Sequence, residues 1–195
     1  REEFVHSFGI YLDNCTSNCL VYGNIIAGTS VGICIHSGKN NIIENNILYG
    51  CSTVLFNIVY VVDIVPGLYC GNVFRRNILC PQKADTPVIQ AVRYSDDLLA
   101  SSDENLIHAL EGEKPIFHIT YEKPLEQLSM VTQEADIEVT LGGWQERGHD
   151  KHSVCADPKF LDGPNMDFRL GPDSPAPALG FIPIDISRAG IRNEK

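Results

Sequence analysis

Two side chains near the start of the chain, Asp13 and His36, are of types that act in acid–base and nucleophilic catalysis. They occupy equivalent positions in a repeated pattern. Each follows an apolar stretch of the same pattern, Gly9–Leu12 in one case and Gly32–Ile35 in the other, 23 residues apart. A carboxylate beside an imidazole can serve as a general acid, a general base or a nucleophile, because the imidazole tunes the carboxyl pKa. An aspartate in a surface turn next to a histidine explains the same pattern without catalysis, and both interpretations stay open.

The elements that would position this pair are short apolar stretches that recur along the chain. Leu20–Ile26 realigns on Ile42–Leu48, and a third copy, Val73–Leu79, follows an insertion around residues 58–71. Glycine, asparagine and serine break each copy, and none has a helical period. Units of about 22 residues with short strands are typical of the coils of a parallel β-helix, which stack about 4.8 Å apart. The sequence therefore predicts an all-β parallel β-helix with an irregular C-terminal closing segment.

Stacked coils place equivalent residues above one another. Asn24, Asn46 and Asn77 are equivalent, so we expect their amides to bond to one another and to the carbonyls of the turns. On the second strand of each coil, Glu44 and Arg75 share the outward side and are expected to form a surface ion pair.

Strand alternation indicates which residues of the first strand face outward. The apolar pairs that we expect to point inward are Ile10 with Leu12, Ile33 with Ile35, and Val54 with Phe56. One outward column would then hold Tyr11, Cys34 and Leu55, and the next would hold Asp13, His36 and Asn57.

The chain is expected to form one structural domain with three parts. Residues 1–82 are predicted to be β-helix coils, 83–141 an irregular excursion of strands and loops packed on the solenoid, and 142–195 a last coil with a capping tail. No sequence typical of an N-terminal cap precedes the first coil, which would leave an unpaired strand edge. We therefore expect the chain to be the C-terminal part of a longer β-helix, with upstream coils or a second chain at that edge.

Composition limits the classes of partner. The net charge of −10 argues against binding to nucleic acid, because no surplus of lysine and arginine is present to neutralise phosphates. No apolar run approaches the roughly 20 residues that a membrane span needs. Seven cysteines without a C-x-x-C pair predict neither a zinc knuckle nor a disulfide framework. The stretch His149–His152 lacks a visible third ligand, so the sequence predicts no metal and no cofactor.

Two parts of the sequence resemble a known family. The stretches Gly9–Asn14, Tyr22–Ile26 and Gly32–Leu48 resemble the right-handed parallel β-helix repeat of the pectate-lyase-like superfamily. The tail from Trp144 to Phe181 resembles the ending of bacterial β-helical glycoside hydrolases. The resemblance covers roughly residues 5–82 and 140–190. It implies a right-handed solenoid and a carbohydrate-active protein.

The resemblance also implies a reaction, hydrolysis of the glycosidic bonds of a plant or host polysaccharide. Asp13 would be the acid/base or nucleophile and His36 its catalytic partner. Where family members carry two adjacent acids, this chain has Asp13 followed by Asn14, so only the first acid is matched. A glycosidase needs two carboxylates, about 5–9.5 Å apart depending on mechanism, and the second is missing from these coils. The candidate residues for binding an oligo- or polysaccharide are Tyr11, Asn14, Ser37, Lys39 and Asn57.

Three functions therefore remain open. The first is a glycoside hydrolase, the second a non-catalytic glycan-binding or structural module, and the third a polysaccharide lyase. Secretion or export to the periplasm and a bacterial cytoplasmic location both fit the sequence.

Overall fold

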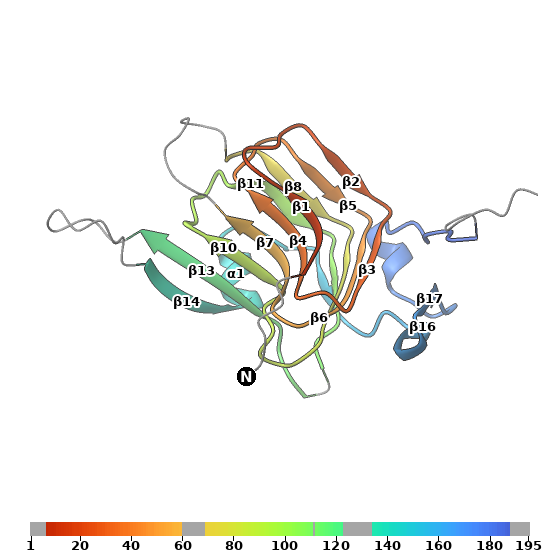
Figure 1. Ribbon diagram of the computed structural model, residues 1–195. Helices are drawn as coiled ribbons and strands as arrows, with labels where there is room; N and C mark the ends of the chain where they lie inside the picture. The colour runs from red at the N-terminus through yellow and green to blue at the C-terminus, as the bar shows by residue number, and fades with distance from the viewer. Residues whose placement is uncertain (1–6, 60–68, 111, 123–133, 188–195) are drawn as a thin grey trace, which may run out of the picture.

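The structure is a computed structural model that describes residues 7–59, 69–110, 112–122 and 134–187. Most of its regular structure is strand, and the strands form three main sheets and a separate two-stranded sheet (Figure 1). Sheet A has the order β1 (Phe8–Leu12), β4 (Val31–His36), β7 (Val54–Val59), β10 (Ile89–Val92), β13 (Ile116–Glu122) and β14 (Glu134–Thr140). Sheet B consists of β2 (Leu20–Tyr22), β5 (Ile42–Glu44), β8 (Asn72–Arg75) and β11 (Leu99–Asp103). Sheet C consists of β3 (Ile25–Ala27), β6 (Ile47–Cys51), β9 (Ile78–Pro81), β12 (Leu106–Ile107) and β15 (Val154–Cys155).

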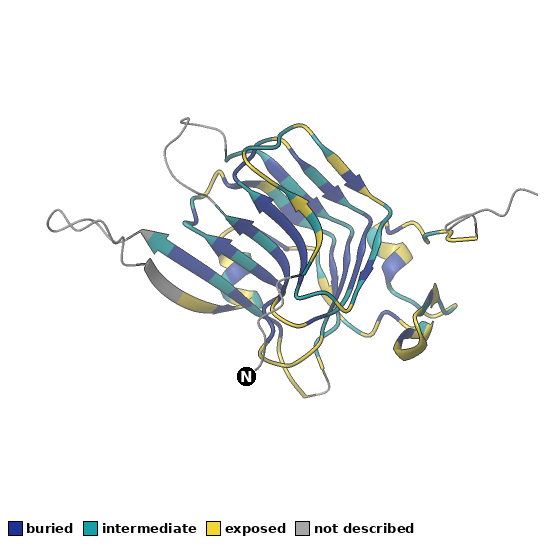
Figure 2. Cartoon of the chain, viewed as in Figure 1, coloured by how far each residue is buried: buried dark blue, intermediate teal, exposed yellow. Residues whose placement is uncertain are grey.

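The chain visits the three sheets in turn, so that each sheet gains its next strand about one repeat later. Neighbouring strands in these sheets pair in parallel, except β13 with β14, which are antiparallel. This arrangement is consistent with a parallel β-helix. Buried residues follow the strands of all three sheets (Figure 2), and the main core lies between the sheets.

The register of sheet A confirms the predicted pairing of the first two repeats and corrects the third. Ile10 pairs with Ile33, as expected, but Ile33 pairs with Phe56, two positions beyond the predicted partner Val54. Inward and outward sides are as predicted in the first two repeats. In the third repeat Leu55, predicted to face outward, lies in the main core, and Val54, predicted to point inward, packs with Cys34 outside it. Asn57 lies opposite Cys34 instead of opposite His36.

The misalignment has a physical reason. Val31 and Val54 pack with Cys34 in a small buried cluster separate from the main core. Apolar side chains thus occupy both sides of these strands, and the alternation of hydrophobicity does not determine a single alignment.

A continuous ladder of amides runs through the corner between sheets B and C. The Nδ2 groups of Asn24, Asn46 and Asn77 donate to the Oδ1 of the next asparagine at 3.0, 3.0 and 3.2 Å, and the last of these acceptors belongs to Asn105. Each of these Oδ1 atoms also accepts the backbone N–H of the preceding ladder residue. The predicted ladder is confirmed and is longer than the sequence repeat indicates.

A buried carboxylate ends the ladder. Asn105 Nδ2 donates to Asp150 Oδ1 at 2.8 Å, and the Asp150 residue is 1% exposed. The same carboxylate accepts the indole N–H of Trp144 at 2.8 Å and the hydroxyls of Ser102 and Ser153. Each asparagine of the ladder donates its amide N–H to the next residue, so the last one needs a partner that accepts without donating. An ionised carboxylate is such a partner, because it only accepts hydrogen bonds.

Residues 83–141, where the sequence predicts an irregular excursion, supply five strands to the same sheets. These strands are β10, β11, β12, β13 and β14. The one reversal of direction within sheet A is at β14.

The C-terminal part closes the core and covers sheet C. The helix α1 (Leu141–Glu146) buries Trp144 completely, and the indole stacks on Phe117 at 5.4 Å. The hairpin of β16 (Phe160–Asp162) and β17 (Asp167–Leu170) and the 3-10 turns η1 (Gly163–Asn165) and η2 (Ala176–Leu179) follow. Phe168 and Phe181 of this tail pack against Ile47, Ile78 and Leu106. None of the helices in the described part of the chain is long and apolar enough to cross a membrane.

The outer face of sheet B carries the predicted ion pair. Arg75 and Glu44 are 3.0 Å apart, and Arg76 joins Glu44 to Glu104 at 3.2 and 2.7 Å. The pairing of β5 with β8 places Glu44 directly opposite Arg75.

Replacing Asn77 by alanine should strongly destabilise the fold. The substitution removes the acceptor for both Asn46 donors and the Asn77 amide that bonds Asn105 and the Ile43 carbonyl. Because these groups are buried, we expect the free energy of unfolding to fall by about 2 to 4 kcal/mol. Urea unfolding measures this loss as a lower midpoint at an unchanged slope.

The matched control is Asn165→Ala, which removes one exposed hydrogen bond to Asp162 and should change stability by less than about 0.5 kcal/mol. Equal midpoints for the two variants would show that the ladder adds nothing to stability.

Candidate functional site

Asp13 and His36 are in direct contact on the outer side of sheet A. Leu12 pairs with Ile35, so the residues that follow them in the two strands are also neighbours. His36 Nδ1 lies 2.9 Å from Asp13 Oδ1, and the two side chains are 26% and 53% exposed. The predicted proximity is therefore present, whereas a catalytic role for the pair stays a prediction.

Aromatic rings flank this pair. Tyr11 stacks on Phe8 with ring centroids 4.7 Å apart, and its ring lies 5.8 Å from that of His36. Burial raises the pKa of Tyr11 to about 12, with further contributions from Cys34 and from the carboxylate of Asp13. The phenol therefore stays protonated at neutral pH and can donate a hydrogen bond.

The turn after β1 holds Asn14 next to the pair. Its backbone N–H donates to Asp13 Oδ1 at 2.9 Å, the same oxygen that His36 Nδ1 contacts, and its φ of 44° is typical of a turn asparagine. Tyr11, Asp13, Asn14 and His36 thus form one exposed group, and we call it the Asp13 cluster.

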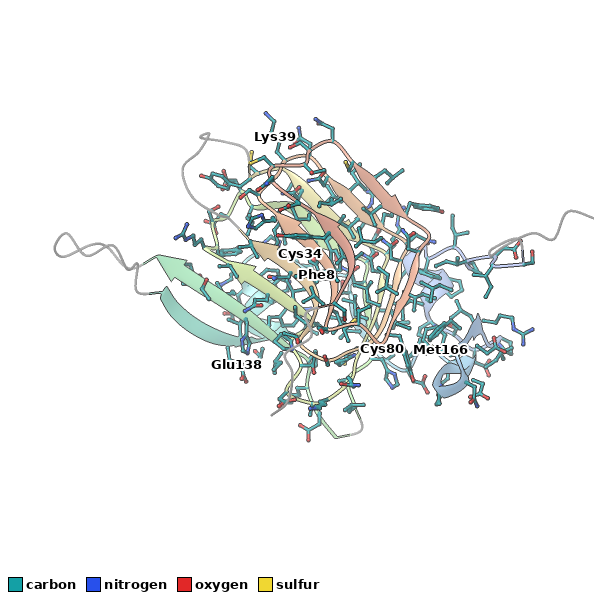
Figure 3. All side chains as sticks on the ribbon, in the orientation of Figure 1. Phe8, Cys34, Lys39, Cys80, Glu138 and Met166 are labelled. Atoms are coloured by element: carbon teal, nitrogen blue, oxygen red, sulfur yellow. The ribbon has the colours of Figure 1, made fainter. Side chains whose placement is uncertain are left out.

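The other predicted binding residues lie at different depths. Ser37 follows His36 but is buried, with its N–H donating to the Val59 carbonyl at 2.7 Å. Lys39 belongs to the turn toward β5, where its N–H donates to Ser17 Oγ, and Figure 3 shows it at the edge of the molecule, away from Phe8 and Cys34. Asn57 lies in the row of Tyr11 and Cys34, as the corrected register requires.

That row extends across the whole of sheet A. Successive strand pairings connect one residue from each of six strands, and we call this set the sheet A row: Tyr11, Cys34, Asn57, Gln90, His118 and Glu138. Cys34 is buried, and the other members are half-buried or exposed. Burial raises the pKa of the Cys34 thiol to about 12, and Asp13 adds to this shift, which disfavours the thiolate that a nucleophilic cysteine needs.

Sequence reasoning missed Gln90, His118 and Glu138. The repeat could not be followed past residue 82, so no alignment placed them beside Asn57. Only the pairing of the strands in the structure identifies them, since Asn57 pairs with Gln90 and Gln90 with His118. The Oδ1 atom of Asn57 is buried and has no hydrogen-bond partner among the described residues.

The histidines of the stretch His149–His152 point to different environments. His149 is buried, stacks on Trp144 at 4.5 Å and has Nε2 3.0 Å from the Tyr94 hydroxyl. His152 lies on the surface, with Nδ1 2.6 Å from Asp103. Across the described part of the chain, no three His, Cys, Asp or Glu side chains form a group that could hold a metal ion.

Opposite pKa shifts follow from these surroundings. Burial lowers the pKa of His149, and the nearby Asp150 and Asp96 oppose this shift while Arg147 adds to it. The hydrogen bond that the His152 imidazole donates to the Asp103 carboxylate raises the pKa of His152.

Comparison with known proteins gives one match. Residues 2–64 match the model of a family described as periplasmic copper-binding protein (NosD). The match covers less than half of the chain, and together with the parallel sheets it is consistent with a parallel β-helix. Neither a curated protein nor a solved structure matches the chain.

The two histidines should affect the pH dependence of stability in opposite directions. Because the pKa of folded His149 lies below its ordinary value, its contribution is complete above about pH 6.5 and is lost on acidification. Because the pKa of folded His152 is raised, its contribution is present on the acid side and is lost as pH rises.

When the pH is lowered from about 7.5 to 5.5, we therefore expect the free energy of unfolding to fall less in His149→Gln than in the unchanged protein. In His152→Gln we expect it to fall more. Chemical unfolding at a series of pH values measures both slopes. The burial argument fails if the His149→Gln variant keeps the slope of the unchanged protein.

Proposed function

We propose that this protein is a right-handed parallel β-helix that binds an oligo- or polysaccharide along the outer face of sheet A. The observation that carries the proposal is the sheet A row, which is continuous with the Asp13 cluster. Both consist mainly of side chains that recognise sugars: aromatic rings, amides, imidazoles and carboxylates. The resemblance to β-helical glycoside hydrolases supports the same class of ligand.

The dimensions of the row suit an extended ligand. Tyr11 and Glu138 are separated by five strand steps, which corresponds to about 24 Å at the usual strand spacing. Amides and imidazoles both donate and accept hydrogen bonds and so match sugar hydroxyls. The ring of Tyr11 offers an apolar face to the C–H groups of a pyranose.

Hydrolysis is the second candidate, and the hydrogen bond between Asp13 and His36 favours it. In that reaction Asp13 would be the acid/base or the nucleophile. A second carboxylate would have to lie within about 9.5 Å of it. The carboxylate that the sheet A row contributes, Glu138, lies at the far end of the row, so it does not meet this requirement. Binding without cleavage is therefore the function we favour.

Copper binding is what the description of the matched family implies. The matched residues 2–64 include thiols and the imidazole of His36. The described residues nevertheless do not fit a copper centre, because no three suitable side chains gather in one place. We therefore derive no function through copper, and the periplasmic location in the family description fits a protein that meets extracellular glycans.

Replacing Tyr11 by alanine should weaken glycan binding by about tenfold, which corresponds to roughly 1.4 kcal/mol. The control is Tyr22→Ala, because Tyr22 is 45% exposed on sheet B and Tyr11 is 43% exposed on sheet A. Affinity electrophoresis in gels that contain xylan, arabinan, galactan, pectin or hyaluronan measures the glycan binding of both variants. If no polysaccharide retards the protein, or if both variants bind alike, the proposal is wrong.

The same polysaccharides distinguish binding from cleavage. We expect neither new reducing ends nor ultraviolet absorption from unsaturated products after prolonged incubation. New reducing ends that disappear in Asp13→Asn would instead establish hydrolysis through Asp13, and unsaturated products would establish a lyase.

A further inference from the structure

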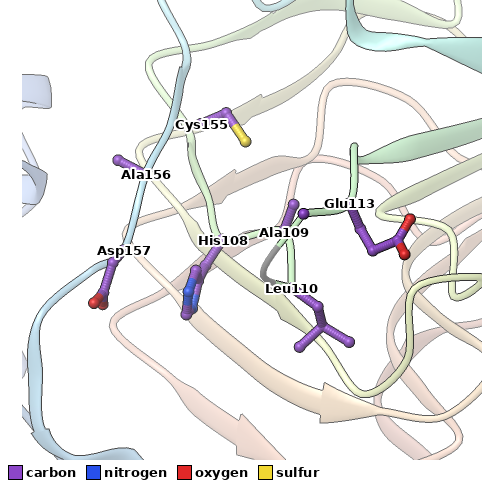
Figure 4. Close-up of a pocket in the computed structure, with 8 residues that line it drawn as sticks. His108, Ala109, Leu110, Glu113, Cys155, Ala156 and Asp157 are labelled. Carbon is purple, nitrogen blue, oxygen red and sulfur yellow. The ribbon is translucent and has the colours of Figure 1, made fainter.

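A groove lies over sheet C, on a different face of the molecule from the sheet A row. It consists of two cavities of about 450 and 330 Å³, and both are lined by His108 and Leu110. Figure 4 shows His108 and Leu110 on the segment that follows β12, with Asp157 on the neighbouring segment. Because the two cavities share these residues, we treat them as one groove and call it the His108 groove.

The backbone of His108 is held in place, but its imidazole has no hydrogen-bond partner among the residues that the structure describes. Its backbone N–H donates to the Leu79 carbonyl at 2.8 Å, which continues the pairing of β12 with β9. Asp157 lies close enough for His108 to help lower its pKa, although the main causes are hydrogen bonds from Lys159. Lys159 donates to both carboxylate oxygens, through N–H at 2.8 Å and Nζ at 2.9 Å. The ring nitrogens of His108 therefore remain available to a ligand.

An aromatic wall stands beside this imidazole. Tyr49 lines the groove and packs on Phe168 and Phe160 of the tail, with ring centroids 5.0 and 6.3 Å apart. These contacts hold the tyrosine ring in one orientation. Met166, which is 56% exposed, adds a second apolar surface to the same cavity. Tyr49 and Met166 can therefore cover the apolar face of a ligand ring in this cavity.

The remaining polar groups of the groove also lack internal partners. Within the described residues, no hydrogen bond engages the Tyr49 hydroxyl, the Gln82 amide or the Glu113 carboxylate, and all three line the cavities. Together with His108 they provide donors and acceptors around an apolar wall. This combination suits a compact ligand with many hydroxyl groups.

The charge of the lining disfavours anionic ligands. The described residues that line the cavities include the carboxylates of Glu113 and Asp157 and neither lysine nor arginine. Because the nearby Lys159 is already paired with Asp157, a phosphate or a uronate would meet the Glu113 carboxylate and no unpaired cation among these lining residues. Cavities of about 300–1,000 Å³ are usual for small ligands, and the groove falls within that range.

We infer that the His108 groove binds an uncharged polyhydroxylated ligand, a neutral mono- or disaccharide. The sugar ring lies against Tyr49 and Met166, and its hydroxyls bond to His108, Gln82 and Glu113. The inference does not depend on the sheet A row, and either site can fail without the other.

Chemical modification of Cys155 can show whether a ligand occupies this groove. It lines the larger cavity and is exposed, whereas the other six cysteines are buried or half-buried. The experiment measures the rate at which a maleimide modifies Cys155, read by peptide mass spectrometry, in the full chain with and without cellobiose, lactose or maltose. We expect at least one disaccharide to slow this modification severalfold.

Variants locate the effect. His108→Ala should abolish the protection, whereas His152→Ala, at an exposed histidine outside the groove, should keep it. Tyr11→Ala should also keep it, because Tyr11 belongs to the other site. Circular dichroism and urea unfolding establish that His108→Ala is folded, and Tyr49→Phe, which removes only a hydroxyl, provides a second, milder test that should weaken protection.

Three results would overturn the inference. The first is an unchanged modification rate with all three disaccharides. The second is equal or stronger protection by glucuronate or glucosamine, which would show that charge determines the binding. The third is loss of protection in Tyr11→Ala, which would assign the effect to the sheet A row.

Discussion

The hydrogen bonds of the amide ladder constrain the whole structure, because each asparagine must both receive from one layer and donate to the next. Asn24, Asn46, Asn77 and Asn105 all donate in the same direction, so the chain of donors needs an acceptor at its end. A fifth amide would leave an N–H without a partner in the core, which is costly. The carboxylate of Asp150 solves this problem, and its other contacts tie the ladder to Trp144 and to the helix that covers the core.

Because the ladder fixes the corner between sheets B and C, it also fixes the register of the strands that carry exposed residues. Inward positions are restricted by packing, as the stacking of Phe56 on Phe74 at 4.1 Å illustrates. Outward positions are free to vary, and they differ from layer to layer: a tyrosine, a cysteine, an asparagine, a glutamine, a histidine and a glutamate follow one another in the sheet A row. A repetitive interior thus supports a surface without repetition, which is what recognition of a specific ligand requires.

The sequence predicts the features that depend on repetition. The asparagine ladder, the pairing of Ile10 with Ile33 and the contact of Glu44 with Arg75 all follow from aligned repeats. Prediction fails where an apolar residue occupies an outward position, since Val31 and Val54 made two alignments of β7 equally good and displaced Asn57 by one column. It also misses groups assembled from distant segments. His108 and Tyr49 meet because the tail folds back over sheet C, and no local pattern encodes that path.

The spacing of the layers also decides between binding and catalysis at the Asp13 cluster. Residues in adjacent layers are about 4.8 Å apart, so a pair of acids suited to a glycosidase must come from the same layer or from layers at most two apart. Two layers from Asp13 the equivalent position holds Val59, which is apolar. In the layer next to Asp13 the equivalent position holds His36, and the imidazole occupies the place where a second carboxylate would act. A histidine there can orient the aspartate and bond a hydroxyl, but it cannot replace the second carboxylate of the usual mechanism. The geometry that brings Asp13 and His36 together therefore favours holding a sugar over cleaving it.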